Sequence, residues 1–222
     1  MAGYFSSSTG KKFLMAASGA ALFAFIVGHL LGNLKIFLGP ESLNSYSAFL
    51  KSLGEILWVA RIGLLVMLAI HIWTAISLTL ENRAARPIAY AKKDYIEASY
   101  ASRTMHLSGI IVFAYIVYHL MHFTFLTIHP ELSHFTDAQG RHDVYRMVVS
   151  SFQQPAIAII YIIANLLLGT HLSHGIYSMF QSLGLVNECP RSKLQVASRV
   201  IGYGIFLAYA SIPLAVWLGV VK

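Results

Sequence analysis

Five long apolar stretches constrain the fold of this chain more than any other feature of its sequence. A helix needs roughly 20 apolar residues to cross the hydrocarbon core of a bilayer. Charged residues make up 11% of the 222 residues, whereas a soluble domain has about a quarter. We therefore predict an all-α integral membrane protein with one domain over residues 1–222. Its five predicted transmembrane helices run over Phe13 to Leu38, Ile56 to Leu80, Thr104 to Ile128, Ala156 to Phe180 and Val200 to Val221.

The cationic residues lie mostly on one side of this predicted bundle. That side has Lys11, Lys12, Arg83, Arg86, Lys92, Lys93, Arg103, Arg191, Lys193 and Arg199. The loops of the other side are nearly neutral and contain Glu41, Glu55, Glu131, Asp137 and Asp143. Because cytoplasmic loops are rich in Lys and Arg, the N-terminus is predicted to be cytoplasmic. The same rule explains the net charge of +7 without any binding of nucleic acid.

Two further features limit how the chain is processed and which cofactors it holds. The first apolar stretch is too long for a cleaved signal peptide and is expected to be retained. The single cysteine, Cys189, excludes an internal disulfide, and an iron–sulfur cluster needs about four thiolates. The chain has no C-x-x-C-H motif for covalent haem attachment. Cys189 is predicted to face the reducing cytoplasm and has no assigned role.

The first and third predicted helices share a sequence repeat with an offset of 90 residues. The first copy, MAASGAALFAFIVGHL, begins at Met15, and the second, MHLSGIIVFAYIVYHL, begins at Met105. Both contain Ser-Gly, followed ten residues later by His-Leu: Ser18, Gly19 and His29 in the first copy, and Ser108, Gly109 and His119 in the second. Because both helices run outward, His29 and His119 are expected at one depth in the outer half. They are named the outer pair.

The second and fourth predicted helices contain a matching pair of histidines. His71 begins the segment HIWTAI and His171 begins HLSHGI, and both helices run inward. His71 lies 12 residues before Arg83, which is ~18 Å at 1.5 Å per residue. The outer pair lies roughly 25 Å from the same side on the same rise. His71 and His171 are therefore expected at a second depth, nearer the cytoplasm, and are named the inner pair.

Two pairs of imidazoles at two depths are typical of two haem groups held edge-on between helices. A neutral imidazole is a good axial ligand of haem iron. When both axial positions are filled, oxygen has no site, and the haem serves as an electron carrier. Gly19 and Gly109 lie near the depth of the inner pair, where a missing side chain would let a macrocycle approach the backbone. Phe25 and Tyr115, each four residues before an outer-pair histidine, could pack on the outer ring.

Other polar residues leave alternatives open. His122 and His174 each follow a proposed ligand by three residues and share its helix face. Either could be the true ligand, or a partner of a propionate or a quinone; the match between the inner-pair segments favours His171. His106 is a candidate partner of an inner propionate or part of a packed interface. Arg61 is equally a candidate partner of an outer propionate and a side chain that extends to the surface. The loop histidines are expected to be solvated: His129, His134 and His142.

The histidines also permit less specific interpretations. A single membrane histidine is often an interhelical hydrogen-bond partner. Four of them, one per helix and paired by depth, favour a functional role. A histidine-lined transporter for protons or metal ions is the alternative from another class, but such proteins have polar interruptions or broken helices near the midplane. Asn165 is the only amide well inside a predicted span.

This arrangement resembles the single-chain, dihaem cytochrome b anchor subunit of bacterial succinate:quinone oxidoreductases, the succinate dehydrogenases and fumarate reductases. The resemblance covers nearly the whole chain. It is carried by Gly28-His29-Leu30 with Gly32-Asn33-Leu34, His71, Tyr118-His119-Leu120, and Gly169-Thr170-His171 followed by Gly175-Ile176-Tyr177. It implies that His29 and His119 are the metal ligands of an outer haem b. The ligands of an inner haem b would be His71 and His171.

The resemblance also implies partners and a location. Electrons would pass between membrane quinone, with menaquinone expected, and a flavoprotein subunit and an iron–sulfur subunit on the cytoplasmic face. Those partners would hold the FAD and the iron–sulfur clusters, and this multi-pass chain in the lipid of a bacterial cell membrane would perform no succinate chemistry. A close alternative is the five-helix dihaem subunit of membrane nitrate reductase, but that family concentrates its four ligands on two helices.

One position departs from the family pattern. Some members have a glutamate two residues before the fourth ligand, which takes part in transmembrane proton transfer. This chain has Gly169 there, and that proton route is not expected. Glu41 and Glu55 lie in the loop that holds the family's quinone-site acid, but neither can be aligned with it.

Overall fold

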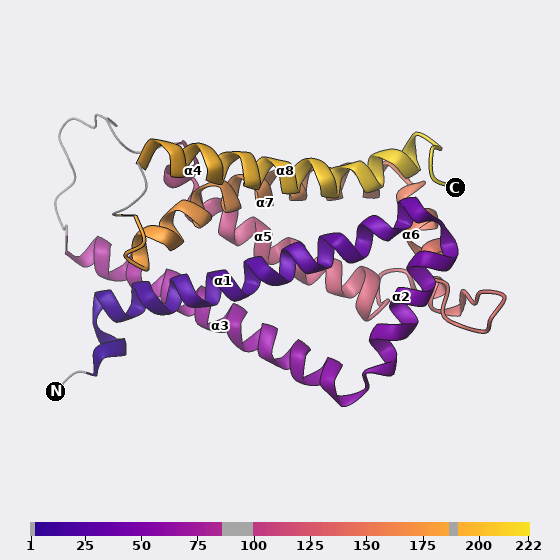
Figure 1. The fold of residues 1–222 in the computed structure, drawn as a ribbon, viewed down its shortest axis with the longest axis horizontal. Helices are drawn as coiled ribbons and strands as arrows, with labels where there is room; N and C mark the ends of the chain where they lie inside the picture. The colour runs from indigo at the N-terminus through magenta and orange to yellow at the C-terminus, as the bar shows by residue number, and fades with distance from the viewer. Residues whose placement is uncertain (1–2, 86–99, 187–190) are drawn as a thin grey trace.

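The computed structural model describes residues 3–85, 100–186 and 191–222, most of which form long helices (Figure 1). The long helices are α1 (Ser8–Asn33), α3 (Glu55–Ala84), α5 (Met105–His119), α7 (Pro155–Ser182) and α8 (Arg191–Trp217). The short ones are η1 (Tyr4–Ser6), η2 (Leu34–Leu38), α2 (Pro40–Ser52), α4 (Tyr100–Arg103), η3 (Leu120–Thr124), η4 (Pro130–His134) and α6 (Val144–Phe152). In the described ranges the only bridge between extended segments joins Thr136 to His142.

Within the described parts of the chain, five helices are long and apolar enough to cross a membrane, which confirms the predicted fold. Several helix ends differ from the ends of the predicted apolar stretches. Helix α8 begins at Arg191 rather than Val200, because an α-helix continues beyond its apolar part as a charged segment that water can solvate. Helix α1 ends at Asn33, and its chain continues to Leu38 as the tighter 3-10 helix η2.

Helices α7 and α8 lie side by side and make the most extensive helix–helix contact among the described residues (Figure 1). A Cβ atom added at Gly169 would lie 2.7 Å from Cβ of Phe206 and 2.9 Å from the carbonyl oxygen of Gly202. One added at Gly202 would lie 2.7 Å from the carbonyl oxygen of Gly169. Small residues in membrane helices allow this approach of two backbones. The contact fixes the position of α7, which contains His171.

Helix α3 is attached differently. It packs mainly against α1, and its buried residues are Thr74 and Leu78, one and two turns beyond His71. Large apolar side chains elsewhere on α3 are exposed, including Trp58, Leu65 and Ile76. A helix in lipid keeps such side chains without cost, because the surrounding chains are as apolar as the helix surface.

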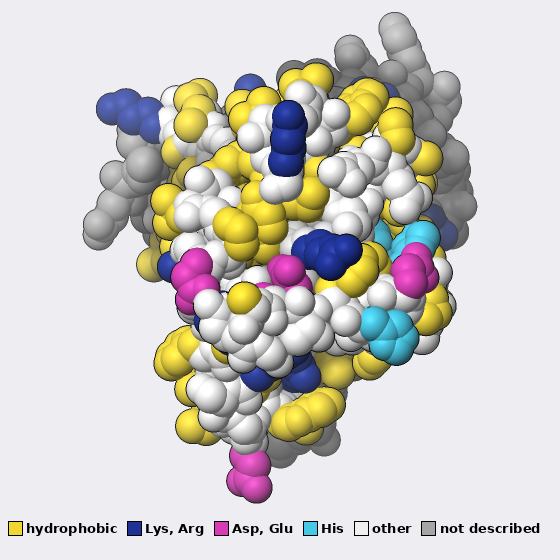
Figure 2. All heavy atoms as spheres, turned by 90° about the vertical axis from the view of Figure 1, so that its right-hand side faces the viewer, with side chains coloured by type: hydrophobic (Ala, Val, Ile, Leu, Met, Phe, Trp, Pro, Cys, Tyr) yellow, Lys and Arg dark blue, Asp and Glu magenta, His cyan; other side chains and the backbone are white. Residues whose placement is uncertain are grey.

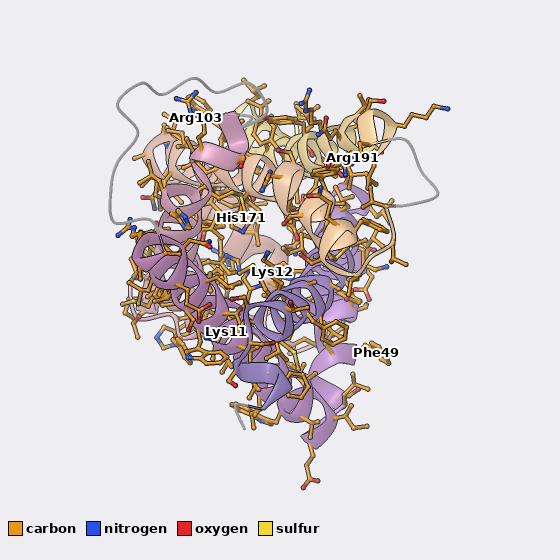
Figure 3. The ribbon with its side chains drawn as sticks, turned by 90° about the vertical axis from the view of Figure 1, so that its left-hand side faces the viewer. Lys11, Lys12, Phe49, Arg103, His171 and Arg191 are labelled. Carbon is orange, nitrogen blue, oxygen red and sulfur yellow. The ribbon has the colours of Figure 1, made fainter. Side chains whose placement is uncertain are left out.

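Cationic side chains surround the end of the bundle where α1 begins, which is named the basic end. Figure 3 views this end and labels Lys11, Lys12, Arg103 and Arg191. Lys11 forms an ion pair with Glu81 that joins α1 to α3. The predicted cytoplasmic residues Arg86, Lys92, Lys93 and Cys189 lie outside the described residues.

The opposite end, named the loop end, contains α2, α6 and the segment between η4 and α6. Acidic, cationic and histidine side chains lie close together there (Figure 2). Arg141 donates to Glu41 and Asp137, at 2.7 Å each, and the hydrogen bond from Arg141 lowers the pKa of Glu41. The buried amide of Asn44 donates to Asp143 and accepts from the backbone of Tyr145, at 2.9 Å each. These bonds join α2 to the segment that leads into α6.

Candidate functional site: two histidine pairs

The inner pair meets in the middle of the bundle. His71 on α3 and His171 on α7 face each other with ring centres 6.5 Å apart and ring planes at 68°. In Figure 3 His171 is seen between the helices, beyond the labelled lysines of the basic end. The Oγ atom of Ser18 lies 3.3 Å from Nδ1 of His71, and that of Ser108 lies 3.2 Å from Nδ1 of His171. The two serines are equivalent positions of the sequence repeat.

The glycines that follow these serines lie against the same imidazoles. A Cβ atom at Gly19 would be 3.3 Å from Cε1 of His71, and one at Gly109 would be 3.6 Å from Cε1 of His171. The sequence predicted these glycines to give room to a macrocycle. In the structure the groups that they face are the histidine rings. The missing side chains therefore let each ring lie close to the backbone of the neighbouring helix.

The outer pair lies nearer the loop end. His29 on α1 and His119 on α5 face each other with ring centres 5.8 Å apart and planes at 84°. Phe25 stacks on His29 with ring centres 5.3 Å apart, and Tyr115 lies 6.0 Å from His119, as the spacing of four residues predicts. The phenol of Tyr161 on α7 is 3.4 Å from Nδ1 of His119. Aromatic rings, rather than serine hydroxyls, therefore surround this pair.

His122 lies in the π-helical turn η3 that directly follows His119. It is fully buried, with 0% of its surface exposed, and its Nδ1 is 3.0 Å from the phenol oxygen of Tyr161. Its Nε2 is buried without a hydrogen-bond partner. The ring stacks on Phe123 at 4.0 Å, and the ring that faces His29 is that of His119. The geometry thus favours His119 over His122 as the outer-pair member from this segment.

A family comparison decides what kind of protein contains these pairs. The model of the succinate dehydrogenase/fumarate reductase transmembrane subunit matches residues 79–210, which is more than half of the chain. This chain belongs to that family. No curated protein and no solved structure matched it. The matched residues include His119 and His171, whereas His29 and His71 precede them.

In this transmembrane subunit the separation of the two imidazole rings in each pair suits a haem iron bound between them. A metal–nitrogen bond of ~2.0–2.1 Å on each side would place two opposed imidazole centres roughly 6 Å apart. The separations are 5.8 Å and 6.5 Å. Over the described ranges no group of three or more His, Cys, Asp or Glu residues could hold a metal ion. A donor set of two imidazoles suits an iron whose other four ligands come from a porphyrin, and the residues fit haem b.

The remaining site candidates of the subunit lie apart from the pair contacts. His174 is half-buried, and the α7 ring that faces His71 is that of His171. His106 is exposed, with Nδ1 3.3 Å from the hydroxyl of Thr79. Arg61 is exposed and lies 5.0 Å from the ring centre of Trp58, an arrangement that agrees with a side chain extending to the surface.

The loop histidines differ in exposure. His134 is exposed, as predicted, whereas His129 and His142 are half-buried. His129 is only partly exposed: its Nδ1 lies 2.9 Å from Glu131, and its ring centre lies 5.3 Å from that of His122. The loop folds back on the end of α5, which brings the ring of His129 close to that of His122.

Sequence reasoning missed several residues that contact the pairs, among them Ser18, Ser108 and Tyr161. The two serines were visible as identities of the repeat, but a repeat does not say which neighbouring helix each copy faces. Tyr161 had no sequence signal, because its contact with His119 depends on the rotation of α7 about its axis. These residues become identifiable only when the helices are placed together.

Proposed function

We propose that this family member holds two haems b, the inner one between His71 and His171 and the outer one between His29 and His119. The observation that carries the proposal is the meeting of four imidazoles two by two, at separations of 6.5 Å and 5.8 Å. Bound in this way, the haems would supply one-electron transfer between two depths of the membrane.

In this proposal each histidine contributes a neutral imidazole nitrogen and holds the cofactor on one face. Two imidazoles per iron leave no axial position for oxygen, so the site favours electron transfer over oxygen chemistry. The helices supply the dry, rigid surroundings: Gly19 and Gly109 admit the inner rings, and Phe25 stacks on His29.

The partners in this proposal are a flavoprotein subunit and an iron–sulfur subunit at the basic end. That end is cytoplasmic by the positive-inside rule, and its cationic side chains offer charge complementarity to a docking partner. The partners would hold FAD and the iron–sulfur clusters, so this chain would be the non-catalytic anchor. Membrane quinone, which we propose to be menaquinone, would exchange electrons near the outer pair. The membrane would be that of a bacterial cell.

The proposal is tested with the complex purified after co-expression with both partners. A reduced-minus-oxidised spectrum and a haem assay should give two low-spin b haems per chain. His29→Ala or His119→Ala should remove one haem, and His71→Ala or His171→Ala should remove the other. His134→Ala, in the exposed loop, is the matched control and should retain both.

Three results would contradict the proposal. The first is a preparation without haem absorbance. The second is a five-coordinate iron that binds carbon monoxide readily. The third is loss of a haem in His122→Ala or His174→Ala while the His119 or His171 variant retains both; this result would reassign that ligand. Succinate–quinone reductase activity of the wild-type complex would test the partner assignment separately.

A further inference from the structure

The serines of the sequence repeat form hydrogen bonds whose direction can be worked out. Ser18 Oγ lies 2.7 Å from the carbonyl oxygen of Leu14 and 3.3 Å from Nδ1 of His71. A hydroxyl has a single proton, and the short contact to the carbonyl, which can only accept, uses it. The contact with His71 is therefore one in which Nδ1–H donates and the serine oxygen accepts.

Ser108 repeats this arrangement on the other side of the inner pair. Its Oγ donates to the carbonyl oxygen of Met105 at 3.1 Å and lies 3.2 Å from Nδ1 of His171. Both serines are buried, with 1% of Ser18 and 3% of Ser108 exposed. Water therefore does not compete for these bonds, and a bond in such surroundings is stronger than one in water.

A proton on Nδ1 fixes the tautomer of a neutral imidazole. Nε2 then has the free electron pair, and it is the atom that can bind a metal. An acceptor at Nδ1–H also makes the ring a more basic ligand and holds its orientation. The same bond on both rings therefore acts on both faces of one site.

We propose that Ser18 and Ser108 are positioning residues of the inner pair, which hold His71 and His171 with Nε2 toward the iron and lower the reduction potential of the inner haem. This inference rests on the proposed function, because it needs a haem between these two histidines. A more basic axial ligand favours the ferric iron, so loss of the bond raises the midpoint potential. The outer pair has no serine partner among the described residues and is the internal reference.

The test is a potentiometric titration of the purified three-subunit complex, followed optically and by the low-spin ferric EPR signals. Ser18→Ala and Ser108→Ala should each raise one midpoint potential and shift its EPR signal, with the other haem unchanged. The double variant should exceed both.

Two sets of variants show whether the hydroxyl itself is responsible. Ser18→Thr and Ser108→Thr keep a hydroxyl and should return the midpoint toward the wild-type value. Ser198→Ala on α8 is the matched control: Ser198 is fully buried and donates to the carbonyl of Leu194 at 2.8 Å. It should leave both midpoints unchanged. If an alanine variant does not accumulate, Ser108→Cys takes its place. Its thiol is a weaker acceptor of similar size, so the midpoint potential of the inner haem should still rise above the wild-type value.

The outcomes separate this inference from the proposed function. If the wild-type complex lacks two bis-histidine haems, the proposed function fails. If both haems are present and the alanine variants leave both midpoints unchanged, the inference is wrong and the proposed function stands. Equal shifts of both haems, or threonine variants that behave like alanine variants, would also overturn it, because the effect would then come from packing.

Discussion

The two copies of the repeat contribute residues to both the inner and the outer pair, but the two pairs have different surroundings. Each copy of the repeat gives one histidine to the outer pair and one Ser-Gly step to the inner pair. The inner imidazoles contact serine hydroxyls at 3.3 Å and 3.2 Å. The outer ones lie among aromatic rings, with Phe25 stacked on His29 and Tyr161 at 3.4 Å from Nδ1 of His119. If each pair holds a haem as proposed, the two haems would have similar ligands and different surroundings.

The difference shows how a repeat can produce two unlike sites. Helices α1 and α5 present their serines and their histidines at two separate depths, so one sequence motif serves both levels. The neighbours are not repeated in the same way: α7 brings Tyr161 to the outer pair, and α3 makes its main contact with α1. The helices that do not share the motif therefore contribute to the difference between the two pairs.

The largest expected effect is at the glycines that border the inner pair. A Cβ at Gly19 would already lie 3.3 Å from His71, so the extra methyl groups of valine would overlap the ring. Gly19→Val and Gly109→Val should remove the inner haem and retain the outer one, as measured by haem content and redox titration. Gly204→Val on α8 is the control, because a Cβ there meets nothing within 4 Å. Retention of both haems in Gly19→Val would show that the inner pair does not depend on the space left by this glycine.

A smaller effect is expected from the hydroxyl of Tyr161, which lies near the outer pair. The contact between Tyr161 and His119, at 3.4 Å, is longer than the usual range for such bonds. Tyr161→Phe should therefore shift the outer midpoint, and by less than Ser108→Ala shifts the inner one. Tyr203→Phe, in an exposed part of α8, should leave both unchanged. If Tyr161→Phe gave the larger shift, the two pairs would not differ as described.

A substitution at His122 tests whether His119, and not His122, is the outer-pair ligand from this segment. His122→Leu removes a 3.0 Å contact with Tyr161 but also removes a buried Nε2 that has no partner. Because the two changes oppose each other, the free energy of unfolding should change by no more than about 1–2 kcal/mol. Both haems should remain. Thermal unfolding and a haem assay would measure this, with His119→Leu as the comparison that loses the outer haem.

The smallest effect concerns the loop end, and it should leave the inner pair untouched. The hydrogen bond from Arg141 lowers the pKa of Glu41 from its ordinary value of 4.5. Its contribution to stability is therefore present above pH 4.5 and lost as the pH falls through the lowered value. Acidification below this range should loosen α2 from the segment that leads into α6.

Arg141→Met should reproduce this loosening at neutral pH. Hydrogen exchange at pH 7 would show faster exchange of the α2 amides in the variant than in the wild type. Arg146→Met is the control, since Arg146 lies over the ring of Phe135 and makes no bond to Glu41. Unchanged α2 exchange in Arg141→Met would show that the Asn44 bonds alone hold α2.

The sequence was sufficient to predict the transmembrane helices, because each of them is recognised from the apolar residues of one continuous stretch. It was not sufficient for α2 and α6, which are too short to span a bilayer and are held by contacts such as those of Asn44 with Asp143 and Tyr145. The repeat indicated that His29 and His119 lie at the same depth. It did not indicate that Ser18 reaches His71, because that contact depends on how α1 is rotated toward α3. The π-helical turn after His119 had no signature either.

The backbone contact at Gly169 has a consequence for how this chain could change by mutation. A glutamate there would have to place its side chain against Phe206 and the carbonyl of Gly202, which lie within 2.9 Å of a Cβ atom. A single substitution could therefore not introduce an acidic proton carrier; α7 and α8 would first have to separate. If electrons cross between two haems as proposed, no acidic group at this position would neutralise their charge, and the movement of one charge across the membrane is worth ~2.3 kcal/mol per 100 mV.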